Sequence, residues 1–200
     1  MANLISLFRV ILAFALLLLL KCFVTQTYYI VAVVLTLIVV LLDALDGWVA
    51  RKLNEQSKLG SVIDILGDRV VENAYWIVFC AYGWVGVYVP LVFMTRSLVT
   101  DTLRSLAFAE GYTAFGKDSM IKNKIGLFLT SSRFSRAVYG AAKVFAFMSV
   151  IICEIPETNI PVWFVLFKDL SVNITVLFCV IRALPVIFES KRFFVKNNEQ

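Results

Sequence analysis

The chain has 200 residues, of which 60% are apolar and 16% charged. Soluble domains average roughly 45–50% apolar and about 25% charged residues, so this composition excludes an ordinary soluble globular domain. The four cysteines are far apart and form no C-x-x-C pair, which excludes a disulfide scaffold. Histidine is absent from the sequence, so histidine-based triads and zinc sites are excluded as well. Any chemistry must come from carboxylates, hydroxyls, lysine and arginine.

Long apolar segments dominate the chain. A helix that crosses the roughly 30 Å core of a bilayer needs about 20 mostly apolar residues. Six such segments occur at residues 4–20, 28–53, 59–84, 88–109, 134–153 and 162–188, and glycine or proline marks the last three connections between them. Backbone polar groups in lipid must be satisfied within the segment, which favours helices. The sequence therefore predicts an all-α integral membrane protein, a six-helix transmembrane bundle that forms one domain over residues 1–200.

The basic residues outside these segments indicate an orientation. One side of the predicted bundle carries Arg51, Lys52, Lys58, Lys117, Lys122, Lys124, Arg133, Arg136, Lys191, Arg192 and Lys196, and the other side carries Lys21 and Lys168. The positive-inside rule places the basic side, with both termini, in the cytoplasm. The formal net charge of +5 then indicates contact with anionic lipid headgroups. No nucleic-acid partner is expected, because a basic face with interleaved aromatic residues is missing.

Acidic residues inside the predicted helices are the most informative feature. They are Asp43, Asp46, Asp64, Asp68, Glu72 and Asp101. Each carries a cost of a few kcal/mol in a membrane, so each is a functional-site hypothesis. Asp43 and Asp46 share a face near the cytoplasmic end of the second helix, and Asp64 and Asp68 share a face just after the following turn. A helical hairpin thus points four carboxylates at one another.

Such a cluster of carboxylates calls for a cation. Four carboxylates in low dielectric repel one another and take up protons unless a cation compensates them. An oxygen-only donor set suits Mg²⁺, Mn²⁺ or Ca²⁺, and paired metals recur in phosphoryl transfer. Gly47 and Gly60 would let a bulky ligand lie against both helices, and Arg51 can meet a phosphate. A divalent-cation transporter is the alternative class, but it needs acidic residues throughout the membrane depth or broken helices at the midplane.

The spacing of these residues matches a known signature. The pattern Asp43-x2-Asp46-Gly47-x2-Ala50-Arg51-x8-Gly60-x3-Asp64-x3-Asp68 resembles that of the CDP-alcohol phosphotransferase family, with all eight signature residues present. The resemblance implies transfer of a phosphatidyl group from CDP-diacylglycerol to an alcohol with release of CMP, or the related transfer of a phosphocholine-type group. It also implies a homodimer.

The resemblance further implies a role for each signature residue. Asp43, Asp46 and Asp64 would be the principal ligands of two Mg²⁺ or Mn²⁺ ions. Asp68 would be the general base and would also contact the second metal. The CDP site would be lined by Asp46, Gly47, Ala50, Arg51 and Gly60.

Four arginines are candidates for binding the acceptor alcohol: Arg96, Arg104, Arg133 and Arg136. Arg96 and Arg104 lie about 12 Å apart on one face of the fourth helix. Because intramembrane arginine is costly, these two should face the interior and pair with an anionic ligand, Asp101 or Glu72. Snorkelling to the membrane surface remains an alternative for Arg104, Arg133 and Arg136. A basic pocket favours an acceptor that carries a phosphate.

Within the family, residues 3–9 are similar to the first helix of bacterial phosphatidylglycerophosphate synthases, and Arg96-x7-Arg104 to their fourth. This implies glycerol 3-phosphate as acceptor and a bacterial inner-membrane location with the active site facing the cytoplasm. Ile65 and Arg69 depart from that subgroup, in which Pro and Lys are common at these positions. Inositol phosphate and phosphatidylglycerol, the latter as in a cardiolipin synthase, remain alternative acceptors.

Overall fold

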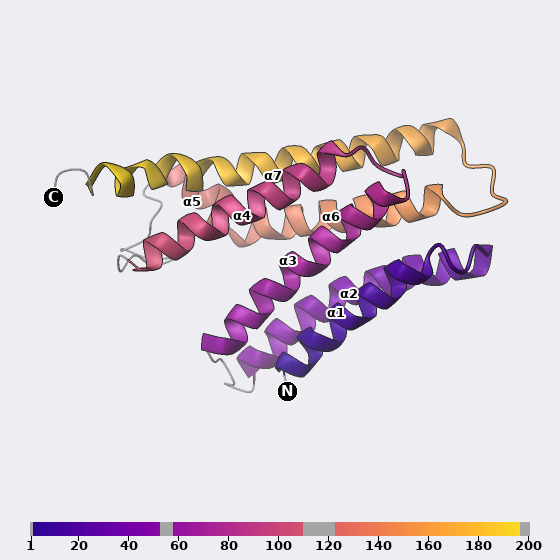
Figure 1. Cartoon of the computed structure of the whole chain (residues 1–200), viewed down its shortest axis with the longest axis horizontal. Coiled ribbons are helices and arrows are strands. Elements are labelled where there is room, and N and C mark those ends of the chain that lie inside the picture. Colours follow the sequence, from indigo (N-terminus) through magenta and orange to yellow (C-terminus); the bar gives the residue numbers. More distant parts are fainter. Residues whose placement is uncertain (1, 53–57, 110–122, 197–200) are drawn as a thin grey trace. The chain divides into compact units, whose positions relative to one another are not determined.

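The computed structural model describes residues 2–52, 58–109 and 123–196. Within these ranges, the description leaves out the side chains of residues 2–5, 43–52, 58–59, 61–64, 109, 124–125, 131, 133 and 191–196. The described residues form seven α-helices and no strand, which confirms the all-α prediction (Figure 1). The helices are α1 (Ala2–Leu19), α2 (Gln26–Lys52), α3 (Lys58–Ala81), α4 (Tyr88–Ala109), α5 (Lys124–Ser131), α6 (Arg133–Cys153) and α7 (Val162–Lys196).

Six of these helices coincide with the six predicted segments, and α5 is additional. This helix has eight residues, so it is too short to give the long apolar run on which the sequence prediction depended. In the described residues, Phe134–Cys153 and Val162–Ser190 are long and apolar enough to cross a membrane. Ser6–Leu19 and Gln26–Leu42 are apolar but shorter. The architecture is consistent with a membrane protein, and the count of six spans stays a prediction.

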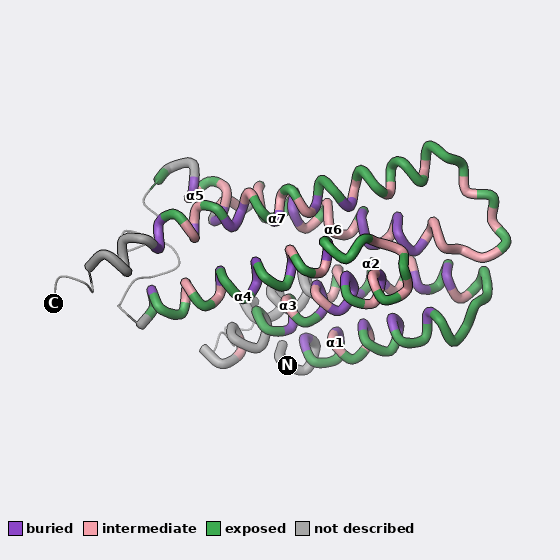
Figure 2. Tube along the Cα trace, turned by 45° about the horizontal axis from the view of Figure 1, so that its top comes forward, coloured by how far each residue is buried: buried purple, intermediate pink, exposed green. Residues whose placement is uncertain are grey.

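The burial pattern of α1 indicates a hydrocarbon environment. Buried positions recur every three or four residues at Ser6, Arg9, Ala13 and Leu16 (Figure 2). The opposite face exposes large apolar side chains, such as Leu18, which is 62% exposed. Monomeric soluble proteins rarely expose a continuous apolar face of this kind. A helix that buries an arginine and exposes leucines is therefore organised for lipid contact.

The chain divides into two compact units, each described here by itself. Unit 1 comprises Met1–Pro90 and Val144–Ser171, and unit 2 comprises Leu91–Lys143 and Val172–Gln200. Helix α1 packs against both α2 and α3 in unit 1 (Figure 1). Helices α6 and α7 each contribute residues to both units.

An aromatic cluster forms the core of unit 1. The Phe147 ring of α6 stacks on the Tyr75 ring of α3, with centroids 4.4 Å apart, and meets the Trp76 ring at 4.8 Å. Phe79 completes the cluster one turn further along α3. Tyr75 also donates a hydrogen bond from its hydroxyl to Thr36 Oγ1 of α2, at 3.1 Å. The buried hydroxyl therefore has a partner, which burial of a polar group requires.

The end of α3 is set by a glycine. Gly83 has φ of 78°, a left-handed conformation that residues with a Cβ rarely adopt. The Gly83 amide donates to the Cys80 carbonyl and the Trp84 amide donates to the Phe79 carbonyl, both at 2.9 Å. These bonds satisfy carbonyls that the last helical turn leaves without partners. The chain can then turn toward α4.

Two phenylalanines of α6 offer a direct test of this core. Phe147→Ala should lower the free energy of unfolding by about 3 kcal/mol, because it leaves a cavity among stacked rings. Phe145→Ala, two residues earlier on the same helix, should change it by less than about 1 kcal/mol, since Phe145 is 61% exposed. Denaturant unfolding in detergent micelles, followed by circular dichroism, measures both changes. Equal losses for the two variants would contradict the assignment of the core.

Candidate functional site

The predicted carboxylate motif lies on α2 and α3 of unit 1. The backbones of Asp43 and Asp46 are in the last turns of α2, and those of Asp64 and Asp68 are in the first half of α3. Asp68 is the member of this set whose side chain the structure describes. The side chains of the other motif residues, Asp43, Asp46, Ala50, Arg51 and Asp64, together with Gly47, lie outside the described residues. The mutual approach of the four carboxylates therefore stays a prediction.

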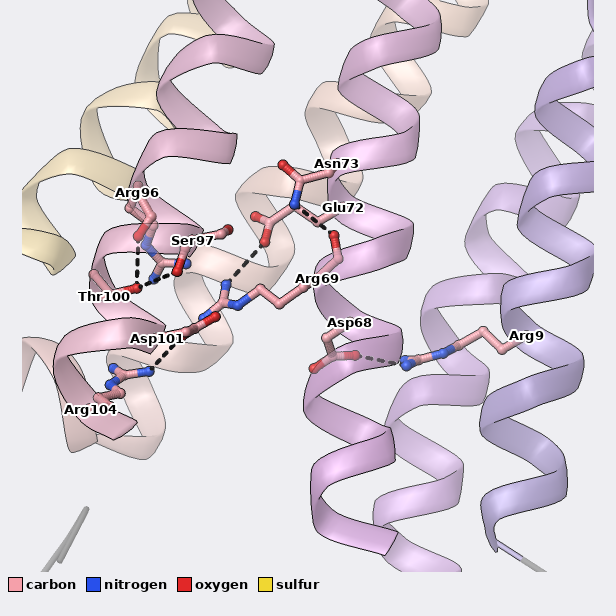
Figure 3. A network of polar contacts seen from close by, with 10 residues as sticks. All are labelled: Arg9, Asp68, Arg69, Glu72, Asn73, Arg96, Ser97, Thr100, Asp101 and Arg104. Atoms are coloured by element: carbon pink, nitrogen blue, oxygen red, sulfur yellow. Dashed lines mark hydrogen bonds and ion pairs between the residues drawn. The ribbon is translucent and has the colours of Figure 1, made fainter. Parts of the chain in front are cut away.

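Asp68 pairs with an arginine from another helix. Arg9 of α1 donates from Nη2 to Asp68 Oδ1 at 2.8 Å, which is the length of a charge-assisted hydrogen bond (Figure 3). The Arg9 side chain is 3% exposed, whereas that of Asp68 is 47% exposed. The carboxylate is thus held from the protein side and remains accessible on its other side.

A glycine makes room for this pair. A Cβ built on Gly67 would lie 3.1 Å from Arg9 Nη2 and 3.6 Å from Val10 Cγ2. The first distance is tighter than ordinary van der Waals contact, so a Cβ at this position would require the guanidinium to shift by a few tenths of an ångström. Gly67 therefore lets Arg9 cross the surface of α3 and reach Asp68.

The donor chemistry of the motif fits a hard divalent cation. All four predicted ligands are carboxylates, and oxygen donors of this kind suit Mg²⁺ and Mn²⁺. Asp68, accessible and bonded through one oxygen, is compatible with such a role. Among the side chains that the structure describes, no group of three or more acidic, cysteine or histidine residues is gathered.

Glu72 has an ion-pair partner on its own helix. It is 3% exposed and accepts from Arg69 Nη1 at 3.3 Å, one turn earlier on α3. Asn73 donates to the Arg69 carbonyl at 2.8 Å (Figure 3). The pairing of Glu72 with Arg96 or Arg104, which the sequence also suggested, stays a prediction. The i, i+3 spacing of Arg69 and Glu72 is a sequence signal that predicts their local ion pair.

The acceptor candidates of α4 lie in unit 2 and differ from each other. Arg96 is 9% exposed, as expected for a residue that faces the interior. Its guanidinium carbon lies 6.0 Å from the centroid of the Tyr139 ring, and Nε and Nη1 are buried with no hydrogen-bond partner. Arg104 pairs with Asp101 on its own helix at 3.7 Å, and both side chains are 37% exposed. Arg136 is exposed at the start of α6, and the side chain of Arg133 lies outside the described residues.

Three cationic side chains lie around the ring of Tyr139 in α6. Besides Arg96, the ring has the Arg182 guanidinium at 5.2 Å and the Lys143 ammonium at 4.8 Å from its centroid. Cation–π attraction offsets part of the cost of bringing these charges together. Three positive charges are therefore gathered around the Tyr139 ring within unit 2.

Arg182 is a buried residue of α7 that the sequence reading did not single out. It donates from Nη1 to the Leu129 carbonyl at 2.7 Å and to Ser135 Oγ at 2.5 Å, and from Nη2 to the Thr130 carbonyl at 3.4 Å. The two carbonyls belong to the last turn of α5, where positive charge is stabilising. Its position inside an apolar segment, as for Arg9, was the available signal, because intramembrane arginine is rare.

The other end of α5 also contacts α7. Glu189 Oε1 accepts from the backbone amide of Asn123, directly before α5, at 3.1 Å. Negative charge is favourable at a helix N-terminus, as positive charge is at its C-terminus. Arg182 and Glu189, seven residues apart on α7, thus hold the two ends of α5.

An open cavity of about 340 Å³ lies between α4 and α7 in unit 2. Apart from Thr95 and Arg96, its lining side chains are apolar. This lining suits hydrocarbon better than a hydrated headgroup, because apolar walls offer no hydrogen bonds to replace those of water.

Comparison with known proteins gives a family match. The model of the CDP-alcohol phosphatidyltransferase family matches residues 1–181. A protein of Aquifex aeolicus named CDP-diacylglycerol–glycerol-3-phosphate 3-phosphatidyltransferase is 43% identical over 68 residues, covering 34% of this chain and 36% of the relative. A protein of Treponema pallidum with the same name is 30% identical over 106 residues, covering 53% of this chain and 49% of the relative.

A third relative carries a different acceptor in its name. CDP-diacylglycerol–inositol 3-phosphatidyltransferase of Schizosaccharomyces pombe is 42% identical over 41 residues, covering 20% of this chain and 17% of the relative. Each of these three alignments spans less than half of the relative's own length.

The contacts of Arg182 predict a local effect on α5. Arg182→Gln should speed amide hydrogen exchange in α5, because loss of the bonds to its last carbonyls lowers local stability by about 1–2 kcal/mol. Lys143→Gln removes another cation from the Tyr139 ring and should leave exchange in α5 unchanged. Hydrogen exchange with mass spectrometry in detergent resolves the segment. Unaltered exchange in Arg182→Gln would show that α5 is held by other contacts.

Proposed function

Because the chain belongs to the CDP-alcohol phosphatidyltransferase family, we propose that it is a membrane enzyme of phospholipid synthesis. It transfers a phosphatidyl group from CDP-diacylglycerol to an alcohol and releases CMP, with glycerol 3-phosphate as the first candidate acceptor. The observation that carries this proposal is the extent of the family match. Residues 1–181 include α2 and α3, which contain all eight signature positions.

The donor site is formed by the ends of α2 and α3 nearest their connection. Asp43, Asp46, Asp64 and Asp68 would hold two Mg²⁺ or Mn²⁺ ions, which neutralise charge on the diphosphate. Gly47, Ala50, Arg51 and Gly60, with Asp46, line the site of the CDP group. The absence of side chains at the two glycines permits close approach of the nucleotide to the helix backbones.

Asp68 is the general base. It takes the proton of the acceptor hydroxyl, and the hydroxyl oxygen then forms a bond to the lipid-bearing phosphorus. The bond between that phosphorus and the oxygen of CMP breaks, and CMP leaves with the electron pair. An accessible carboxylate held by a buried arginine supports this role, because a base must reach the proton in a fixed orientation.

The acceptor site is formed by arginines of unit 2. Arg96, Arg104, Arg133 and Arg136 were candidates from the sequence, and the contacts around Tyr139 add Arg182. Buried guanidinium atoms without hydrogen-bond partners on Arg96 support an anionic ligand, since unsatisfied buried donors are costly. This charge favours an acceptor with a phosphate group, and the names of the Aquifex and Treponema relatives point in the same direction.

The membrane arrangement follows from the same proposal. The chain crosses the membrane six times, both termini are cytoplasmic, and the catalytic site faces the cytoplasm of a bacterial cell, at its inner membrane. Basic residues in the second and fourth connections support this orientation. The working form is a homodimer.

A panel of acceptors tests the proposed activity. The purified full chain in detergent, with radiolabelled CDP-diacylglycerol and Mg²⁺ or Mn²⁺, should release CMP with glycerol 3-phosphate and not without an acceptor. The other arms are inositol phosphate, inositol, serine and phosphatidylglycerol. Release with one of these instead would reassign the acceptor, and no release with any of them would reject the activity in favour of cation transport.

The role of Asp68 is tested by a single isosteric change. Asp68→Asn should lower CMP release by about 10³-fold, because an amide cannot take the proton. Binding of CDP-diacylglycerol should remain largely intact. Asp169→Asn, an exposed aspartate at the start of α7, serves as the matched control and should retain full activity. An active Asp68→Asn variant would remove the assignment of the base.

A further inference from the structure

Arg9 places a positive charge inside an apolar helix. It lies in the middle of α1, is 2% exposed, and has large apolar neighbours in sequence that face outward. Burying an arginine in a membrane helix costs a few kcal/mol even on lenient scales. Ion pairs with a buried member are also often no better stabilisers than apolar packing. A purely structural role therefore gives a weak account of this residue.

The geometry of the contact is asymmetric. The guanidinium is buried and bonded to one carboxylate oxygen of Asp68, Oδ1, at 2.8 Å, while the Asp68 side chain remains 47% exposed (Figure 3). The glycine at position 67 provides the space through which Arg9 reaches α3. The planar guanidinium donates in a fixed direction, unlike the rotating ammonium of lysine. Arg9 thus fixes the orientation of the Asp68 carboxylate and leaves the other side of that carboxylate accessible.

We propose that Arg9 is a positioning residue for Asp68, which it restricts to offering one oxygen to a bound cation or a substrate hydroxyl. The inference rests on the proposed function, in which Asp68 is a metal ligand and the base. Its consequence is a preference among divalent cations. Mg²⁺ and Mn²⁺ favour octahedral sites with one oxygen from each carboxylate, whereas Ca²⁺ takes more ligands and readily binds both oxygens of a carboxylate.

The experiment measures metal preference without turnover. Mn²⁺ bound to the full chain in micelles with CDP-diacylglycerol, and without acceptor, is followed by electron paramagnetic resonance while Mg²⁺ or Ca²⁺ is added in competition. Arg9→Gln should shift the ratio of the two competitor affinities toward Ca²⁺ by about tenfold, the lower end of the effect seen on changing residues that orient metal ligands.

Three further variants separate positioning from folding. Arg9→Lys keeps the charge without the planar fork and should show a smaller shift in the same direction. Gly67→Ala forces the guanidinium to shift by a few tenths of an ångström and leaves both partner side chains unaltered. It should also shift the ratio toward Ca²⁺, and it tests the inference even where Arg9→Gln fails to fold. Lys21→Gln, which removes a cation that lies over the Tyr82 ring just beyond α1, should leave the ratio unchanged.

CMP release provides the second measurement. In an active enzyme, Arg9→Gln should lower kcat by about tenfold or more and leave the KM for CDP-diacylglycerol within about twofold. An unchanged kcat, an unchanged metal ratio, or a wild-type chain that binds no Mn²⁺ would overturn the inference. A wild-type chain that binds Mn²⁺ but releases no CMP with any acceptor would instead reject the proposed function. In that case, the ratio of the Mg²⁺ and Ca²⁺ affinities in Arg9→Gln alone tests whether Arg9 positions Asp68.

Discussion

A charge in an apolar environment needs a partner, and this constraint organises the polar contacts of the structure. Arg9 is bonded to Asp68 and Glu72 to Arg69, while Arg182 donates to two backbone carbonyls and a serine. Each contact offsets a desolvation cost that hydrocarbon surroundings make large. Arg96 has the weakest compensation, an aromatic ring at 6.0 Å. That difference is what makes it a candidate for an anionic ligand.

The same constraint explains why apolar side chains face outward. In lipid, little is gained by transferring a leucine from the surroundings to the protein interior, so helix association depends on packing and polar contacts. The stacked rings of Tyr75 and Phe147 and the hydrogen bond from Tyr75 to Thr36 supply both within unit 1. The interior holds the polar groups that lipid cannot satisfy, and the outer face of α1 carries residues such as Leu18.

Much of the fold is readable from the sequence, because its main signal is the length of apolar runs. All six predicted segments coincide with helices. Helix α5 was missed because its stability depends on contacts with Arg182 and Glu189, and eight residues are too few for an independent helix. Local pairs such as Arg69 with Glu72 were visible in their spacing. The pairing of Arg9 with Asp68, 59 residues apart, requires the packing of α1 on α3. The carboxylate motif was recognisable because matching it requires only residue types and their spacing, and no knowledge of side-chain geometry.

The way in which α7 holds α5 has a consequence for sequence divergence. Arg182 contacts Leu129 and Thr130 through their carbonyl oxygens, and Glu189 contacts Asn123 through its amide. Backbone groups are supplied by nearly every residue type, so these contacts place no restriction on the side chains of α5. The side chains on which this contact depends are those of α7 and of Ser135, whose hydroxyl accepts from Arg182. Substitution is therefore tolerated wherever an α5 residue contributes only its backbone, whereas Leu127, which packs against Ala107 and Val186, and Thr130, which is 7% exposed, are also restricted by packing.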